Sequence, residues 1–138
     1  MGPGRKLREV AAEPDGALDQ LQALRHRADE DYLHPAAEHP PGRHQLDLAE
    51  LGLRVAVTRA RYPNRTDGVD QYAVTISRIQ LDRPAAEDDV RTVLTLTFGA
   101  AATQARERTT AVSPVRMFRV PAEVGVRAHQ GHETARPE

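Results

Sequence analysis

The chain has 138 residues, a formal net charge of −1 and neither cysteine nor tryptophan. This length fits one domain of modest size, and the lack of cysteine excludes disulfides, thiolate metal ligands and cysteine nucleophiles. No stretch approaches the about 20 apolar residues of a membrane-spanning helix, and no apolar signal-peptide core follows Arg5 and Lys6. We therefore expect a cytoplasmic protein that makes no contact with a membrane.

The N-terminal part of the chain predicts one long amphipathic helix. Residues 1–14 show no apolar repeat, so we expect a flexible lead with a short helical piece at Leu7 to Ala12. Asp15 is a favourable N-cap residue, and His34-Pro35 marks the end of the helical pattern. The helix is predicted over residues 15–33. Its apolar stripe consists of Leu18, Leu21, Leu24, Ala28 and Tyr32.

The next segments predict a linker and a hairpin. Three prolines and a glycine make residues 34–44 a loop or linker. Apolar and polar side chains then alternate over residues 51–58 and again over residues 71–77, which predicts two strands. Residues 62–68 between them are rich in turn-forming types and predict a hairpin loop.

Changes of parity at the ends of these strands predict two irregularities. Leu46 and Leu48 are expected to begin the first strand earlier, with a bulge at Ala49-Glu50 that resets the alternation. A bulge or a strand end is expected near Arg78, because Ile79 falls out of phase with the residues before it.

The C-terminal half predicts one or two further strands. Residues 90–98 are expected to form a third strand, which places Arg91, Val93 and Thr95 on its outer face. Residues 100–110 are expected to be a short helix or an excursion, and the apolar patch over residues 115–120 an edge strand, because prolines flank it. We expect residues 122–138 to be a disordered tail.

These elements predict an α+β fold. The N-terminal amphipathic helix is expected to pack on a three- to four-stranded antiparallel meander sheet over residues 45–121. Residues 15–121 would then be a single domain.

The residues that usually carry chemistry are scarce or badly spaced. The chain has two serines and one lysine, and neither serine lies in the glycine-rich turn of a hydrolase nucleophile. The histidines in the first third of the chain lack the i, i+3 or i+4 spacing of helical metal ligands, and the His129/His132 pair falls in the predicted tail. The glycines do not cluster as in a phosphate-binding loop. We therefore expect no metal and no cofactor.

The outer face of the predicted sheet is the most informative candidate site, because its side chains are small and mostly uncharged. A face that only met water would carry more Lys and Glu, and a platform for single-stranded nucleic acid would carry aromatic rings. A face of this kind suits contact with a protein partner or a second copy, although threonine also occurs on plain solvated sheets. The candidate interface residues are Arg54, Ala56, Thr58, Ala73, Thr75, Arg91, Val93 and Thr95.

Three functions remain open on the residues alone. The first is a non-enzymatic protein-binding or accessory module, whose partner would be another protein or a second copy of the chain. The second is a small enzyme or ligand-binding protein with a His/Arg site between helix and sheet. That site would be a deep pocket lined by at least two of the residues His26, His34, Tyr72 and Arg78. The third is a nucleic-acid binder that uses Arg59, Arg61 and Arg65 near the hairpin loop.

Overall fold

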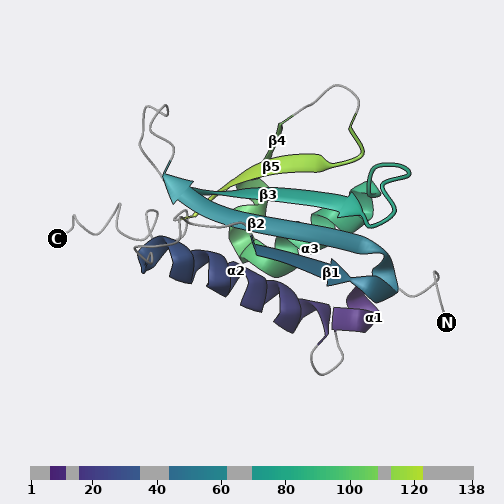
Figure 1. The fold of residues 1–138 in the computed structure, drawn as a ribbon, viewed down its shortest axis with the longest axis horizontal. Helices are drawn as coiled ribbons and strands as arrows, with labels where there is room; N and C mark the ends of the chain where they lie inside the picture. The colour runs from purple at the N-terminus through teal and green to yellow at the C-terminus, as the bar shows by residue number, and fades with distance from the viewer. Residues whose placement is uncertain (1–6, 12–15, 35–43, 62–69, 109–112, 123–138) are drawn as a thin grey trace.

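A computed structural model describes residues 7–11, 16–34, 44–61, 70–108 and 113–122 and shows an α+β fold (Figure 1). The helical elements are α1 (Leu7–Ala11), α2 (Ala17–Leu33), η1 (Ala49–Leu51), α3 (Glu87–Phe98) and η2 (Gly99–Gln104). The strands are β1 (His44–Leu48), β2 (Leu53–Arg61), β3 (Asp70–Arg78), β4 (Arg106–Arg108) and β5 (Arg116–Pro121). All strand pairs are antiparallel, in the order β1-β2-β3-β5-β4.

The predicted long helix is present as α2 and packs on the sheet. Its N-cap residue is Gly16, not Asp15, which lies outside the described residues. The buried face is formed by Leu21, Leu24 and Ala28, whose spacing of three and four positions keeps them on one side of the helix. Figure 1 shows α2 beside β1 and α3 behind the strands.

The short helical piece at the N-terminus is confirmed as α1. It buries Leu7 and Val10 in the same hydrophobic cluster as α2, the sheet and α3. The expected domain limits and the tail over residues 122–138 fall almost entirely outside the described residues and stay predictions.

One continuous strand with a bulge at Ala49-Glu50 was the wrong expectation. The segment is instead the hairpin β1–η1–β2, in which a single 3-10 turn reverses the chain. Gly52 follows that turn at φ +69°, in the left-handed region that glycine enters at little cost. The reversal explains the change of parity that the bulge was meant to explain.

The β2–β3 pair follows the predicted alternation. Val55 lies opposite Ile76 and Val57 opposite Val74 on the face toward the helices, and these side chains are buried. Strand β3 ends at Arg78, as the change of parity there indicated. The predicted hairpin loop at residues 62–68 lies outside the described residues, between the paired ends Arg61 and Asp70.

The predicted third strand over residues 90–98 is wrong, because this segment forms most of helix α3. Val90, Val93 and Leu94 recur at helical spacing and are buried. The acidic run Glu87, Asp88 and Asp89 occupies the first turn, where the helix dipole favours negative charge. Hydrophobic burial on one helical side therefore outweighs the strand propensity of the valines and threonines.

The last apolar patch is a strand, but it is not at an edge. Strand β5 pairs with β3 on one side and with β4 on the other. Its prolines do not prevent this, because Pro114 precedes the strand and Pro121 is its last residue. The segment over residues 100–110 supplies η2 and β4. Among the described residues, no helix is both long and apolar enough to cross a membrane.

A pair of alanine substitutions tests whether residues 90–98 are helical. Val93→Ala should lower the free energy of unfolding by about 2 kcal/mol, because it deletes fully buried methyl groups. Thr95→Ala on the exposed side should change it by less than about 0.5 kcal/mol. Urea unfolding followed by circular dichroism gives both values. A strand would place the two side chains on one face, so equal losses would contradict the helix.

Candidate functional site

The sheet register brings a large part of the predicted interface together. Arg54, Ala56 and Thr58 of β2 lie beside Ser77, Thr75 and Ala73 of β3, on the side away from the core. The same face continues onto β5 with Met117 and Arg119, opposite Thr75 and Ala73. We call this surface the outer face. It comprises Arg54, Ala56, Thr58, Gln71, Ala73, Thr75, Ser77, Met117 and Arg119.

Arg91, Val93 and Thr95 do not belong to the outer face. They lie on α3, where Val93 is fully buried in the core and Arg91 forms an ion pair with Glu87 at 3.0 Å. Their misplacement follows from the wrong strand prediction. The sequence interpretation missed Met117 and Arg119, although alternation with Phe118 and Val120 could have identified their side of the strand.

The side chains of the outer face are small at its centre and charged toward its margins. Ala56, Gln71 and Ser77 are buried, Thr58, Ala73 and Thr75 are half-buried, and Met117 is 37% exposed. On the β1 side, Arg54 donates two hydrogen bonds to the carboxylate of Asp47, at 2.7 and 3.0 Å. These hydrogen bonds hold the pKa of Asp47 below its usual value. Helices α2 and α3 pack on the opposite face of the sheet.

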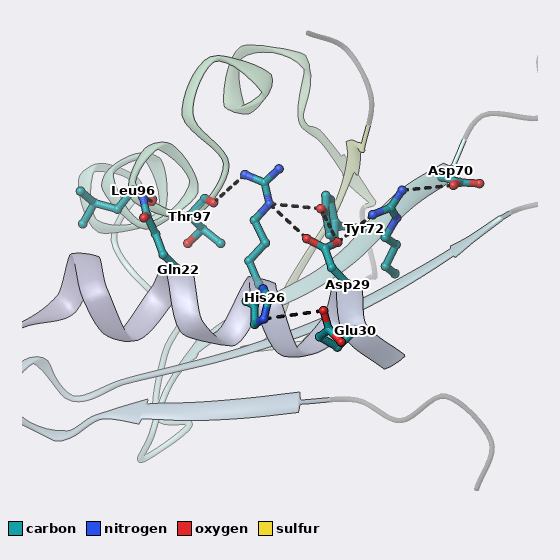
Figure 2. Close-up of polar contacts among 10 residues, drawn as sticks. Gln22, His26, Asp29, Glu30, Asp70, Tyr72, Leu96 and Thr97 are labelled. Atoms are coloured by element: carbon teal, nitrogen blue, oxygen red, sulfur yellow. Dashed lines mark hydrogen bonds and ion pairs between the residues drawn. The ribbon is translucent and has the colours of Figure 1, made fainter. Parts of the chain in front are cut away.

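A polar cluster ties α2 to the inner face of the sheet (Figure 2). Asp29 of α2 accepts a hydrogen bond from the Tyr72 hydroxyl at 2.7 Å and another from Arg59 at 2.9 Å. Arg59 also contacts Asp70 at 3.3 Å, and Asp70 accepts a hydrogen bond from the Tyr32 hydroxyl at 2.8 Å. Each carboxylate therefore faces a guanidinium and a phenol.

Arg25 extends this cluster to α3. Its Nε donates to the Tyr72 oxygen at 3.1 Å, and a terminal nitrogen donates to the Thr97 carbonyl at 3.2 Å. Its guanidinium also lies near the rings of Tyr72 and Phe98, with 5.4 and 5.8 Å to their centroids. The cluster therefore joins the helix, the sheet and α3 at one point (Figure 2).

Burial and charge shift the acidity of two members of the cluster. Burial, followed by the hydrogen bond to Asp29, raises the pKa of Tyr72. Burial alone would lower the pKa of Arg59, but hydrogen bonds and opposite charge, chiefly from Asp29, outweigh it and raise that pKa. Both shifts favour the protonated forms that the hydrogen bonds require, so the cluster is built to hold elements together.

The His/Arg site predicted between helix and sheet is not assembled. Tyr72 lies there, but the His26 side chain is 71% exposed beside Glu30, and His34 is exposed at the end of α2. Arg78 donates to Asp82 at 2.7 Å at the far end of β3. No group of three potential metal ligands occurs in the part of the chain that the structure describes.

The predicted basic loop is only partly described. Arg59 is turned inward, with 11% of its side chain exposed and two carboxylates in contact. The side chain of Arg61 and the whole of Arg65 lie outside the described residues. Arg59 therefore cannot serve a nucleic-acid phosphate without leaving Asp29 and Asp70.

A pocket that the sequence interpretation missed lies between α3, η2 and the β4–β5 strands. Its volume is about 490 Å³, and Val90, Leu94 and Phe118 supply apolar walls. Arg116 stands at its side, 2.7 Å from Glu107 and 3.0 Å from Glu87. These contacts lower the pKa of Glu107, mainly through the Arg116 hydrogen bonds, and raise that of Arg116.

Alkaline titration tests the cluster through Tyr72. Because its pKa is raised, this hydroxyl contributes stability that is complete below pH 10 and is lost as pH rises through the higher folded value. Tyr72→Phe should cost about 1–3 kcal/mol of unfolding free energy at pH 7. As pH rises above 10, the unfolding free energy of this variant should fall by less than that of the wild type. Urea unfolding at a series of pH values measures both effects, and absorbance at 295 nm follows the ionisation of tyrosine. If the unfolding free energy of the two proteins fell equally with pH above 10, the role given to the Tyr72 hydroxyl would be contradicted.

Comparison with known proteins identifies no relative of this chain. No protein-family model matches it, and neither the curated proteins nor the solved structures give a match. The candidate sites therefore rest on the geometry of the chain itself: the outer face, the polar cluster around Tyr72 and the pocket beside Arg116.

Proposed function

We propose that the protein is a non-enzymatic protein-binding module and that its partner docks on the outer face. The observation that supports this most is the distribution of packing between the two sides of the sheet. The described helices pack on the inner face. The outer face instead carries Ala56, Ala73 and Thr75 at its centre, where no described helix packs.

The size of these side chains favours close contact with a flat partner. Stacked sheets pack about 10 Å apart, and short side chains let a second surface approach without deep interdigitation. Met117 adds an exposed, adaptable apolar side chain at the β5 margin, and methionine is enriched in protein interfaces. The arginines on this face are weaker evidence for binding, because nearly every basic residue of the chain is an arginine and only one is a lysine.

The charge around the outer face favours an acidic partner over a second copy. Arg119 lies directly opposite Arg106 of the neighbouring strand, and like charges in that position repel each other. Arg54 lies at the other margin, and Asp47 is the carboxylate beside it. Two copies packed through this face would bring further arginines together, whereas acidic side chains of a partner would relieve the repulsion.

The other two functions have weaker support. The polar groups between α2 and the sheet are bonded to one another, so a ligand there would have to break the contacts of Asp29 and Tyr72. A nucleic-acid platform uses aromatic rings to stack bases. The outer face contains no aromatic residue.

Photo-crosslinking tests the proposal in cells that produce the protein. A photoreactive benzoylphenylalanine at Thr75 should form a discrete adduct, because this position lies at the centre of the outer face. The same residue at Ala23, which is exposed on α2, is the matched control and should give no such adduct. Mass spectrometry identifies the captured chain, and an adduct of two copies would show self-association. Equal labelling at both positions, or none at Thr75, would contradict the proposal.

A binding measurement with the purified captured protein completes the test. Thr75→Arg should weaken its binding about tenfold or more, because a long charged side chain prevents close approach to the sheet. Ala23→Arg, on the exposed side of α2, should bind as the wild type does. Circular dichroism establishes that both variants are folded.

A further inference from the structure

Strand β4 forms the last position of the described sheet. Its residues Arg106, Glu107 and Arg108 are all exposed, and β5 is its paired neighbour. A strand in this position offers main-chain N–H and C=O groups along its open side. Such an edge can accept an extended peptide as an additional strand.

The side chains of β4 divide between the two faces of the sheet. Arg106 and Arg108 lie opposite Arg119 and Met117, so they belong to the outer side. Neither arginine forms an ion pair with any residue that the structure describes. Glu107 lies opposite Phe118 on the inner side and binds Arg116.

The inner side at Glu107 is also where the pocket lies. Glu107 and Phe118 line it together with Val90 and Leu94 of α3. A strand added to the sheet beside β4 would run about 4.8 Å from β4. The residue that such a strand places opposite Glu107 would therefore point toward the mouth of this pocket, whose apolar walls include Val90, Leu94 and Phe118.

We propose that the β4 edge binds an extended peptide segment of a partner by strand addition, with the pattern acidic–apolar–acidic. The acidic residues lie opposite Arg106 and Arg108, where opposite charges on neighbouring strands attract each other. The apolar residue between them enters the pocket beside Glu107. The main-chain hydrogen bonds supply affinity and the alternating side chains supply specificity.

The charges of Arg106 and Arg108 favour an acidic peptide at the β4 edge over a second copy of the chain. Two β4 strands paired edge to edge would bring arginines against arginines at every outer position. Arginine on an edge also protects a strand from unwanted pairing. Protection alone, however, does not require a pocket of about 490 Å³ with apolar walls beside Glu107, the middle residue of that edge.

This peptide site goes beyond the proposed use of the outer face and stands apart from it. The two surfaces meet at β5 but use different residues. Thr58 is on β2, three strand positions away from β4, because β3 and β5 lie between them. The variant Thr58→Arg therefore changes the outer face far from the β4 edge. This variant should block a partner on the outer face and leave peptide binding unchanged, so the two proposals can fail separately.

A charge-swap experiment tests the site. The probe is the fluorescent peptide Thr-Glu-Leu-Glu-Thr-Val, measured by anisotropy against a peptide with lysine in place of both glutamates. The wild-type protein should bind the acidic peptide saturably and the lysine peptide at least about tenfold more weakly. The double variant Arg106→Glu, Arg108→Glu should reverse this preference. Arg27→Glu, an exposed change on α2, is the matched control and should behave as the wild type.

Two further readouts report on the pocket and the backbone. Replacing the central leucine of the peptide by serine should weaken binding about tenfold. Amide resonances of Glu107 and Arg108 should shift with the acidic peptide, and their hydrogen exchange should slow. The proposal would be overturned if the wild type bound both peptides equally well, or if the double variant kept the wild-type preference. It would also be overturned if the folded protein bound no peptide at about 1 mM.

Discussion

The structure depends on the fact that a pleated sheet has two faces and that both long helices pack on the same one. The strict alternation of β2 and β3 sends Val55, Val57, Val74 and Ile76 to one side, where α2 and α3 cover them. Hydrophobic burial on this side supplies the driving force for folding. The other side receives alanines and threonines that contribute little to the core. The architecture therefore leaves a surface whose composition a core does not explain.

The polar cluster around Tyr72 fixes the helices in place on the buried side. Asp29, Arg59 and Tyr72 come from three different elements, and Arg25 adds α3 through the Thr97 carbonyl. Desolvating such charges is costly, and losing one partner of a buried pair typically costs about 3–5 kcal/mol. Hydrophobic contact permits many helix positions, whereas these directional bonds select one. The cluster thus gives specificity to the same packing that keeps the outer face clear of helices.

Local patterns predicted the parts of the fold that local physics determines. Alternation over residues 51–58 and 71–77 identified β2 and β3, because no helix could place those apolar side chains on one side. The apolar residues of segment 90–98 fit both a strand and a helix period, and packing against α2 and the common core decides for a helix. Arg91, Val93 and Thr95 were therefore assigned to the wrong surface. The place of β5 beside β3 depends on pairing between residues that are 40 to 50 positions apart in the sequence. The Asp29–Arg59 bond likewise joins residues 30 apart, which no spacing rule reveals.

The middle of the outer face around Thr75 and Met117 meets solvent in the isolated protein, whereas the helices close the inner face. Methyl NMR with a soluble gadolinium chelate measures this directly, at a concentration where light scattering shows a monomer. We expect strong relaxation of the Met117 and Thr75 methyl resonances and none at Val57 and Val74, which are buried between sheet and helices. Equal protection of all four residues would show that the chain covers its own outer face, which would contradict a docking surface there.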